Sequence, residues 1–221
     1  MLWVFDVNET MLDLSPLDAV FERIAGSPDA RREWFELLVR SALVTTAAGQ
    51  YRDFGRLGAA CAEAVARAHG YELDGWGTAE LVTAFRELPA HPEVPGALQS
   101  LRERGHRVVA LGNSPRAVVD AQLENSGLAL LLDAAYSAGD AQALKPAAAA
   151  YRMVLDAEQA APDQAVMVAA HDWDIAGAQA AGMHAVLIGR PGARPPLPPW
   201  PEPDLIAADL ADAADSRLAR A

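Results

Sequence analysis

Carboxylate, amine and imidazole side chains directly follow several short apolar runs of this chain, and these groups can do covalent chemistry. Asp6 ends the run at residues 2–5, and it could attack an electrophilic carbon or phosphorus to form a covalent intermediate. Lys145 could keep that carboxylate ionised. Asp174 could orient or deprotonate the water that resolves the intermediate, and His171 is a second candidate for this role because its pKa is easily tuned.

Two neighbouring polar residues favour an anionic ligand. Ser114 precedes Pro115 at the expected start of a helix, whose free backbone N–H groups attract an anion such as a substrate carboxylate. Asn113 offers an amide donor beside that position. We therefore expect the substrate to be a small anionic molecule.

Most of these residues also have a purely structural interpretation. Ser114 and Asp174 are of types that cap helices, and Lys145, which precedes a proline, could lie in a solvated loop. His171 could satisfy a backbone carbonyl, and Tyr151 could be a core ring. The functional interpretation is favoured because the polar clusters occur in order at the ends of successive expected strands.

Alternating strand and helix patterns predict the elements that position these residues. Buried strands are expected at residues 2–5, 107–111, 134–137, 166–170, 184–188 and 205–207. Helical patterns between them indicate an α/β fold with a parallel sheet covered on both faces, whose carboxyl strand ends share one edge. Residues 14–90 show only helical patterns. We therefore expect an all-helical cap domain at 14–90, inserted into a catalytic core formed by 1–13 and 91–221.

Composition and charge argue against several classes of partner. The net charge of −12 disfavours nucleic acid and anionic membrane surfaces, and no stretch approaches the roughly 20 apolar residues of a membrane span. The N-terminus enters a strand at once, without a basic segment, so a cytoplasmic location is expected. Apolar cap residues such as Trp34 and Leu38 leave a homodimer possible.

Four motifs resemble those of the haloacid dehalogenase superfamily. They are Phe5-Asp6-x-x-x-Thr10, Leu111-x-Asn113-Ser114-Pro115, Lys145-Pro146 with Tyr151 beyond it, and the Asp174 cluster. The helical insertion after the first motif resembles the type II L-2-haloacid dehalogenases. The resemblance implies a Rossmann-like sheet with a helical cap. It also implies that Asp6 displaces halide from the carbon next to a carboxylate, and that water then attacks the Asp6 carbonyl.

Further site residues follow only from this resemblance. It gives supporting positions to Thr10, Asn113, Lys145, Tyr151 and Asp174. It implies no metal and no other cofactor for the dehalogenase reaction.

The chain departs from the dehalogenase pattern at three positions. Gly112 stands where the second motif usually has Ser or Thr, and Ser114 is the candidate to supply the missing hydroxyl. A Trp-Arg pair of the cap, whose arginine helps to receive the halide, corresponds here to Trp34-Phe35. His171 stands where the dehalogenases have an amide. The same expected helix carries Arg31, Arg32 and Arg40. One of these could replace the missing cation only if the helix presents a different face to the site.

A phosphatase of the same superfamily is the first alternative function. Those enzymes need Mg²⁺ and an acid two residues after the nucleophile, where this chain has Asn8. An amide is not a useful proton donor at neutral pH. Asp172 and Asp174 could still hold a metal ion, so this alternative stays open.

A non-catalytic binding protein that retains the fold is the second alternative. Gly112 and Phe35 favour it, because they replace groups that the dehalogenase reaction uses. Asp6 and Lys145 speak against it, because a buried ion pair without a function contributes little stability.

Overall fold

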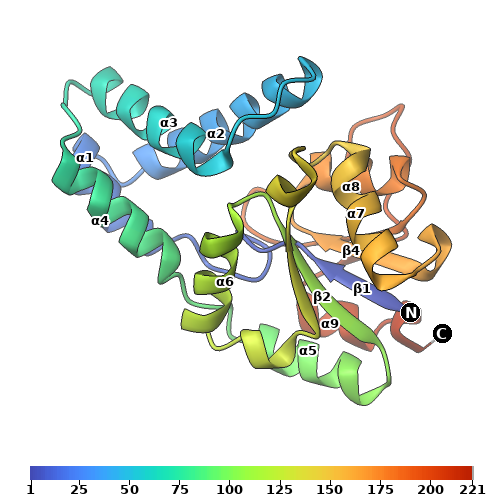
Figure 1. Cartoon of the computed structure of the whole chain (residues 1–221). Helices are drawn as coiled ribbons and strands as arrows, with labels where there is room; N and C mark the ends of the chain where they lie inside the picture. Colours follow the sequence, from blue (N-terminus) through green and yellow to red (C-terminus); the bar gives the residue numbers. More distant parts are fainter. Residues whose placement is uncertain (221) are drawn as a thin grey trace.

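The structure, a computed structural model that describes residues 1–220, is built around one parallel β-sheet (Figure 1). Its strands are ordered β3-β2-β1-β4-β5-β6. Their bounds are β1 (Leu2–Phe5), β2 (Arg107–Gly112), β3 (Ala134–Ser137), β4 (Ala165–Ala169), β5 (His184–Ile188) and β6 (Leu205–Ala207). The predicted α/β fold is confirmed, and each predicted strand agrees with the observed one to within one residue at either end. The first strand lies between β2 and β4, so Asp6 emerges from the interior of the sheet rather than from an edge strand.

Helices cover both faces of the sheet, because successive side chains of β1 point to opposite faces. Trp3 and Phe5 belong to the apolar cluster that includes α5, α6 and α9, whereas Leu2 and Val4 pack with α7 and α8. The bounds of these helices are α5 (Val94–Glu103), α6 (Arg116–Asn125), α7 (Ala148–Glu158), α8 (Asp172–Ala180) and α9 (Leu210–Asp215). Short 3-10 helices occupy Ala129–Leu131, Ala138–Ala141, Pro162–Gln164 and Leu218–Arg220.

Four further helices lie between β1 and α5 in the chain and stand to one side of the sheet (Figure 1). They are α1 (Leu17–Ala25), α2 (Ala30–Ala47), α3 (Phe54–Ala68) and α4 (Gly75–Arg86). Residues 14–90, all of which the structure describes, add no strand to the sheet. Within residues 1–220, none of the helices has both the length and the apolar character to cross a membrane.

The segment after β1 carries the chemistry-bearing residues of the first motif. Asp6 is fixed at the strand end because its backbone N–H donates to the carbonyl of Val168 at 3.0 Å. The chain then turns back, and the N–H groups of Met11 and Leu12 both donate to the Val7 carbonyl. Within this turn Glu9 has a φ of 62°, a left-handed conformation that is uncommon for a residue with a Cβ.

Candidate active site

Lys145 is the centre of a buried cluster of charged groups at the carboxyl edge of the sheet. Its Nζ lies 2.8 Å from Asp6 Oδ1 and 2.6 Å from Asp174 Oδ2, and it donates to the Leu111 carbonyl at 2.9 Å. All three N–H donors of the ammonium group are therefore used. The Lys145 backbone N–H donates to Asn113 Oδ1 at 2.8 Å. With 1% of its surface exposed, Lys145 is not a solvated loop residue.

The second oxygen of the Asp6 carboxylate is held by Thr10. Thr10 Oγ1 donates to Asp6 Oδ2 at 2.7 Å and accepts a hydrogen bond from the Ala170 N–H at the end of β4. Burial raises the pKa of the Asp6 carboxyl, but the charges of Lys145 and His171 outweigh this effect and hold the pKa well below its usual range. Asp6 is therefore ionised at neutral pH, as a nucleophile must be.

Asp174 is enclosed by its partners. It lies inside α8 rather than at its N-cap, which is His171. Tyr151 Oη donates to Asp174 Oδ1 at 2.6 Å, Lys145 takes the other oxygen, and neither Asp174 nor Tyr151 has exposed surface. Burial raises the pKa of Asp174, and the positive charge of Lys145 opposes this rise. Burial also raises the pKa of Tyr151 well above its usual value. Asp174 is placed to orient Lys145.

Close packing between α8 and the segment before α7 holds Tyr151 in this position. A Cβ added at Gly177 would lie 2.5 Å from Tyr151 Oη and 2.6 Å from Pro146 Cβ. These distances are shorter than van der Waals contact, so only glycine fits there without a shift of its neighbours.

We expect Gly177→Ala to lower the free energy of unfolding by about 1–3 kcal/mol, because overpacking forces buried neighbours apart. Urea unfolding measures this change. The matched control is Gly96→Ala in α5, where nothing lies within 4 Å of the added Cβ, and where alanine should stabilise the helix by roughly 0.5–1 kcal/mol. Equal unfolding midpoints for the two variants would contradict the packing argument.

His171 lies between two carboxylates. Its Nε2 is 2.9 Å from Glu9 Oε2, and its Nδ1 is 3.4 Å from Asp6 Oδ2. The ring stacks on Trp173 with centroids 5.2 Å apart and contacts the Phe35 ring at 5.8 Å. Burial lowers the pKa of His171, but Asp6 and Glu9 outweigh burial and raise it to about 9. His171 is therefore an imidazolium at neutral pH, and its partners are carboxylates rather than a backbone carbonyl.

Glu9 is the residue of this cluster that the sequence analysis did not select. Its position between Asp6 and Thr10 in the first motif could have indicated that it belongs to the site. A carboxylate in a tight turn beside a nucleophile needs a cationic or hydrogen-bonding partner. Arg31 of α2 supplies one, with Nη1 3.6 Å from Glu9 Oε1, and it also pairs with Asp18 of α1. Arg31 of the helical segment thus forms ion pairs with Glu9, in the turn after β1, and with Asp18.

Phe35 and Ser114, two further residues selected from the sequence, contact different members of the site. Phe35 is 8% exposed, and its ring covers His171. Ser114 is buried, and its Oγ accepts a hydrogen bond from Asn8 Nδ2 at 3.4 Å; it does not cap α6, whose N-cap is Pro115. At Gly112 an added Cβ would come within 3.1 Å of a methyl group of Val119. There is thus little room for the hydroxyl side chain that the second motif usually carries.

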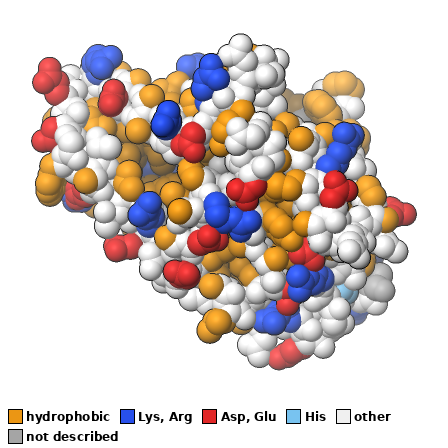
Figure 2. All heavy atoms as spheres, in the orientation of Figure 1, with side chains coloured by type: hydrophobic (Ala, Val, Ile, Leu, Met, Phe, Trp, Pro, Cys, Tyr) orange, Lys and Arg blue, Asp and Glu red, His pale blue; other side chains and the backbone are white. Residues whose placement is uncertain are grey.

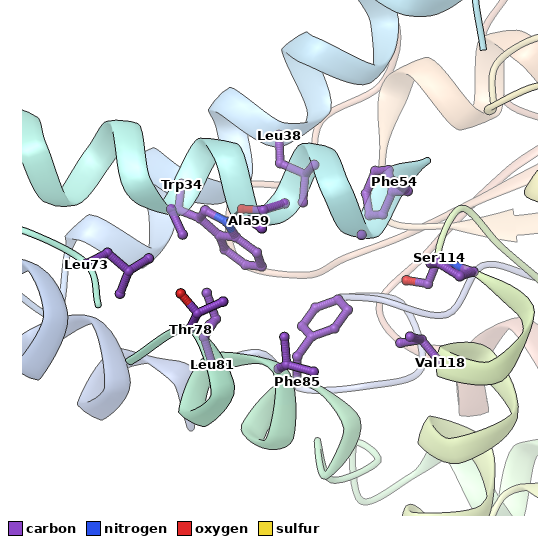
Figure 3. Close-up of a pocket in the computed structure, with 15 residues that line it drawn as sticks. Trp34, Leu38, Phe54, Ala59, Leu73, Thr78, Leu81, Phe85, Ser114 and Val118 are labelled. Atoms are coloured by element: carbon purple, nitrogen blue, oxygen red, sulfur yellow. Dashed lines mark hydrogen bonds between the residues drawn. The ribbon is translucent and has the colours of Figure 1, made fainter. Parts of the chain in front are cut away.

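An apolar cavity of about 80 Å³ lies between α2, α3, α4 and the start of α6 (Figure 3). Its lining includes Trp34, Leu38, Phe54, Leu81, Phe85 and Ser114. In Figure 3, Ser114 and Val118 mark its end at the core, and Leu73 marks the opposite end. Figure 2 shows hydrophobic side chains gathered in a hollow over the same helices. Since one water needs about 10–15 Å³ by a comparable measure, the cavity has room for several non-hydrogen atoms.

The residues at the site do not fit a magnesium ion. The Lys145 ammonium lies between Asp6 and Asp174, where a cation shared by two carboxylates would lie. Asn8 Oδ1 accepts a hydrogen bond from Gln122 at 3.0 Å. Within residues 1–220, no group of three or more His, Cys, Asp or Glu side chains is arranged to hold a metal ion.

A parallel sheet with a buried, ionised aspartate beside a lysine at its carboxyl edge gives this α/β chain the groups that a hydrolase with a carboxylate nucleophile needs. The chain belongs to the haloacid dehalogenase-like hydrolase family, whose model matches residues 2–182. The predicted superfamily is therefore confirmed.

Individual relatives include both dehalogenases and a phosphatase. (S)-2-haloacid dehalogenase 4A of Burkholderia cepacia is 29% identical over 194 residues, which cover 87% of this chain and 84% of that protein. A phosphoserine phosphatase of Thermus thermophilus is 35% identical over 136 residues, 59% of this chain and 54% of that protein. The L-2-haloacid dehalogenase structure from Xanthobacter autotrophicus shares the fold, with a TM-score of 0.91, 21% identity and coverage of 100% and 99%.

Proposed function

We propose that the protein hydrolyses small 2-haloacids through an ester on Asp6. The observation that carries this proposal is the Asp6 carboxylate itself, which is 5% exposed, ionised, and held on one oxygen by Lys145 and on the other by Thr10. An anionic nucleophile fixed in this way has lost most of its orientational freedom before substrate binds, which lowers the barrier to attack.

The first half-reaction follows from these positions. A carboxylate oxygen of Asp6 attacks carbon 2 of the haloacid, the carbon–halogen bond breaks, and the halide leaves with the bonding electrons. Asp6 becomes a neutral ester. Free N–H groups at the start of α6, beside Asn113 and Ser114, favour the substrate carboxylate. Lys145 keeps its hydrogen bonds to Asp174 and Leu111, so the pocket retains its shape as the charge on Asp6 disappears.

Two details of the site weigh against a phosphatase. The ammonium group of Lys145 lies between the two carboxylates on which a magnesium site would depend. Asn8, two residues after Asp6, cannot protonate a leaving group, and its amide is already bonded to Ser114 and Gln122. The phosphatase relative also matches only 59% of this chain.

Chloride release from (S)-2-chloropropionate, with and without EDTA, tests the proposal directly. We expect the rate of chloride release to be the same with and without EDTA. We also expect a single turnover in ¹⁸O-labelled water to place the label in the Asp6 carboxylate. Hydrolysis of a phosphate ester with strict Mg²⁺ dependence would establish the phosphatase instead. Ligand binding without either activity would establish a binding protein.

We also propose that residues 14–90 act as a cap over a core formed by 1–13 and 91–221. The separate position of α1–α4 supports this division (Figure 1), and so does the placement of Phe35 against His171. A cytoplasmic location and a homodimer stay predictions.

The apolar cavity predicts that substrates with longer side chains bind as well. We expect Ala59→Leu, which fills part of the cavity lining, to raise KM for 2-chlorohexanoate about tenfold, the effect of one or two methylene groups in a pocket. KM for 2-chloropropionate should not change. Ala60→Leu, one residue along α3 and exposed, is the control. Equal effects on both substrates would show that the cavity does not hold the substrate chain.

A further inference from the structure

Arg190 is a nearly buried arginine beside the turn that carries the nucleophile. It follows β5, and its side chain is 11% exposed. Its Nε and Nη2 groups both donate to the carbonyl oxygen of Thr10, at 3.3 Å and 2.9 Å, and Nη2 also donates to Glu93 Oε1 at 2.6 Å. A guanidinium group holds such acceptors firmly because its donors form a rigid planar fork.

Thr10 is the residue through which this contact reaches the nucleophile. Its hydroxyl donates to Asp6 Oδ2 at 2.7 Å and accepts a hydrogen bond from the Ala170 N–H at 3.0 Å. The end of β4 therefore fixes the hydroxyl of Thr10, and Arg190, after β5, fixes the carbonyl of the same residue. With both groups held, the hydroxyl has little freedom to turn away from Asp6.

We propose that Arg190 is a positioning residue for the nucleophile: it fixes Thr10, which in turn orients the Asp6 carboxylate for attack, and Glu93 aims the guanidinium group. This inference rests on the proposed function, because it concerns the first step of the same reaction. Arg190 acts only through Thr10 and does not touch the reacting atoms.

The turn that follows Asp6 needs an anchor of this kind. Glu9, directly before Thr10, has a φ of 62°. Such a conformation costs free energy for a residue with a Cβ and persists only where its surroundings hold it. The N–H groups of Met11 and Leu12 close the turn on the carbonyl of Val7. These two hydrogen bonds leave the Thr10 carbonyl to the guanidinium group, which holds the turn from outside.

The same guanidinium group binds where the helices α1–α4 connect with the sheet. The two connecting segments run side by side, and Leu12 and Ala90 form an antiparallel bridge between them. Thr10 lies just before this pairing in the chain, and Glu93, the N-cap of α5, lies just after it. One side chain thus joins the sheet-side ends of both segments. We therefore expect a movement of α1–α4 to stop at this contact and to leave the nucleophile in place.

A purely structural ion pair between Arg190 and Glu93 makes a different prediction. Loss of such a pair would lower the melting temperature, but the variant that remains folded would react at the wild-type rate. Kinetics of the folded variant therefore distinguish a positioning role from a structural one.

Arg190→Met tests the positioning role through the separate effects on kcat and KM. We expect kcat for (S)-2-chloropropionate to fall about 10- to 100-fold, the range that a small misplacement of a reacting group produces. KM should change little, so that kcat and kcat/KM fall together. Chloride release in a single turnover should slow by the same factor, because the affected step is the attack of Asp6. Arg194→Met, at an exposed arginine of the same segment, is the matched control and should react like the wild type.

A double-mutant cycle with Thr10→Val shows whether Arg190 acts through the Thr10 hydroxyl. Valine keeps the backbone carbonyl that Arg190 binds, but it has no hydroxyl for Asp6. Adding Arg190→Met to Thr10→Val should therefore lower the single-turnover rate by less than about twofold. Independent losses that multiply in the double variant would overturn the assignment. Arg190→Lys keeps a charge beside Glu93 but has no fork, and it completes the same cycle if the methionine variant does not fold.

Hydrogen exchange tests the anchor without turnover. In Arg190→Met we expect the amide hydrogens of Met11 and Leu12 to exchange several-fold faster, because the turn that they close has lost its outer contact. The amide of Asp6, which is bonded within the sheet, should exchange at the wild-type rate. Glu93→Ala should change the exchange in the same direction by a smaller factor. Unchanged exchange at Met11 and Leu12 in Arg190→Met would overturn the anchor, and unchanged exchange in Glu93→Ala would remove Glu93 from the proposal.

The outcomes separate this inference from the proposed function. If the wild type forms neither chloride nor an ester on Asp6, the proposed function fails, and hydrogen exchange still reports whether Arg190 holds the turn. If the wild type reacts and folded Arg190→Met reacts with the same kcat, the positioning role fails and the function stands. A raised KM with unchanged kcat would place Arg190 in substrate binding and would overturn the assignment as well.

Discussion

Asp6→Asn is expected to lower kcat for haloacid hydrolysis by roughly 10⁴-fold or more, the loss seen when a nucleophile is removed. An amide keeps the size of the side chain but offers no anionic oxygen to the substrate carbon. Chloride release under single-turnover conditions measures this effect, because it reports the first bond that breaks. An unchanged melting temperature of the variant would show that activity is lost because the nucleophile is missing and not because the protein is unfolded.

Asp13→Asn is the matched control for this substitution. Asp13 lies in the same segment after β1, but its carboxylate binds only the backbone and hydroxyl of Ser15. We expect its activity to equal that of the wild type. Turnover by a homogeneous Asp6→Asn preparation at more than a trace of the wild-type rate would show that the nucleophile lies elsewhere.

Lys145→Met should both abolish activity and lower the free energy of unfolding by about 3–5 kcal/mol, the usual result of removing one partner from a buried ion pair. Lys145 is the only lysine in the sequence, and its ammonium group is shared by Asp6 and Asp174. Methionine fills a similar volume but leaves the Asp174 carboxylate buried without a cation and leaves Asp6 with His171 as its remaining cationic partner. Urea unfolding at neutral pH measures the loss. Arg107→Met, which breaks a pair with Glu158 at a half-exposed arginine, should cost only about 0–1 kcal/mol.

The pH dependence of Lys145→Met provides a second test with a defined sign. In the wild type the pKa of Asp6 is lowered by folding, so its contribution to stability is present above its ordinary pKa of 3.8 and is lost as the pH falls. Without Lys145, burial and the neighbouring Asp6 charge raise the pKa of Asp174 further, whereas His171 still opposes the effect of burial on Asp6. The stability of the variant should therefore increase as the pH falls toward 5. A variant with the same pH profile as the wild type would show that Lys145 does not control these two acids.

Arginine at position 145 should not restore the site. The ammonium group is compact and satisfies three acceptors in three directions, whereas a guanidinium group is planar and larger. Apart from histidines, all other cationic side chains in the sequence are arginines. The geometry of the site explains why position 145 has a lysine instead.

The sequence by itself determined the sheet, the order of its strands along the chain and the residues at their ends. Runs such as 2–5 and 166–170 are apolar without alternation, and this local property is sufficient to predict a buried parallel strand. Because parallel strands end at one edge, Asp6 and Lys145 could be expected to meet. The motifs of the family were visible for the same reason, since they follow those strand ends.

Only the tertiary structure decided how the side chains pair across long distances in the chain. The contact of Glu9 with His171 joins residues 162 positions apart and depends on a single left-handed residue, which no periodic pattern encodes. The occupation of both Asp174 oxygens and the pairing of Arg31 with Asp18 likewise depend on side-chain directions set by packing. Sequence patterns fix which elements form, but the partner of a charged group is chosen by the three-dimensional arrangement that buries it.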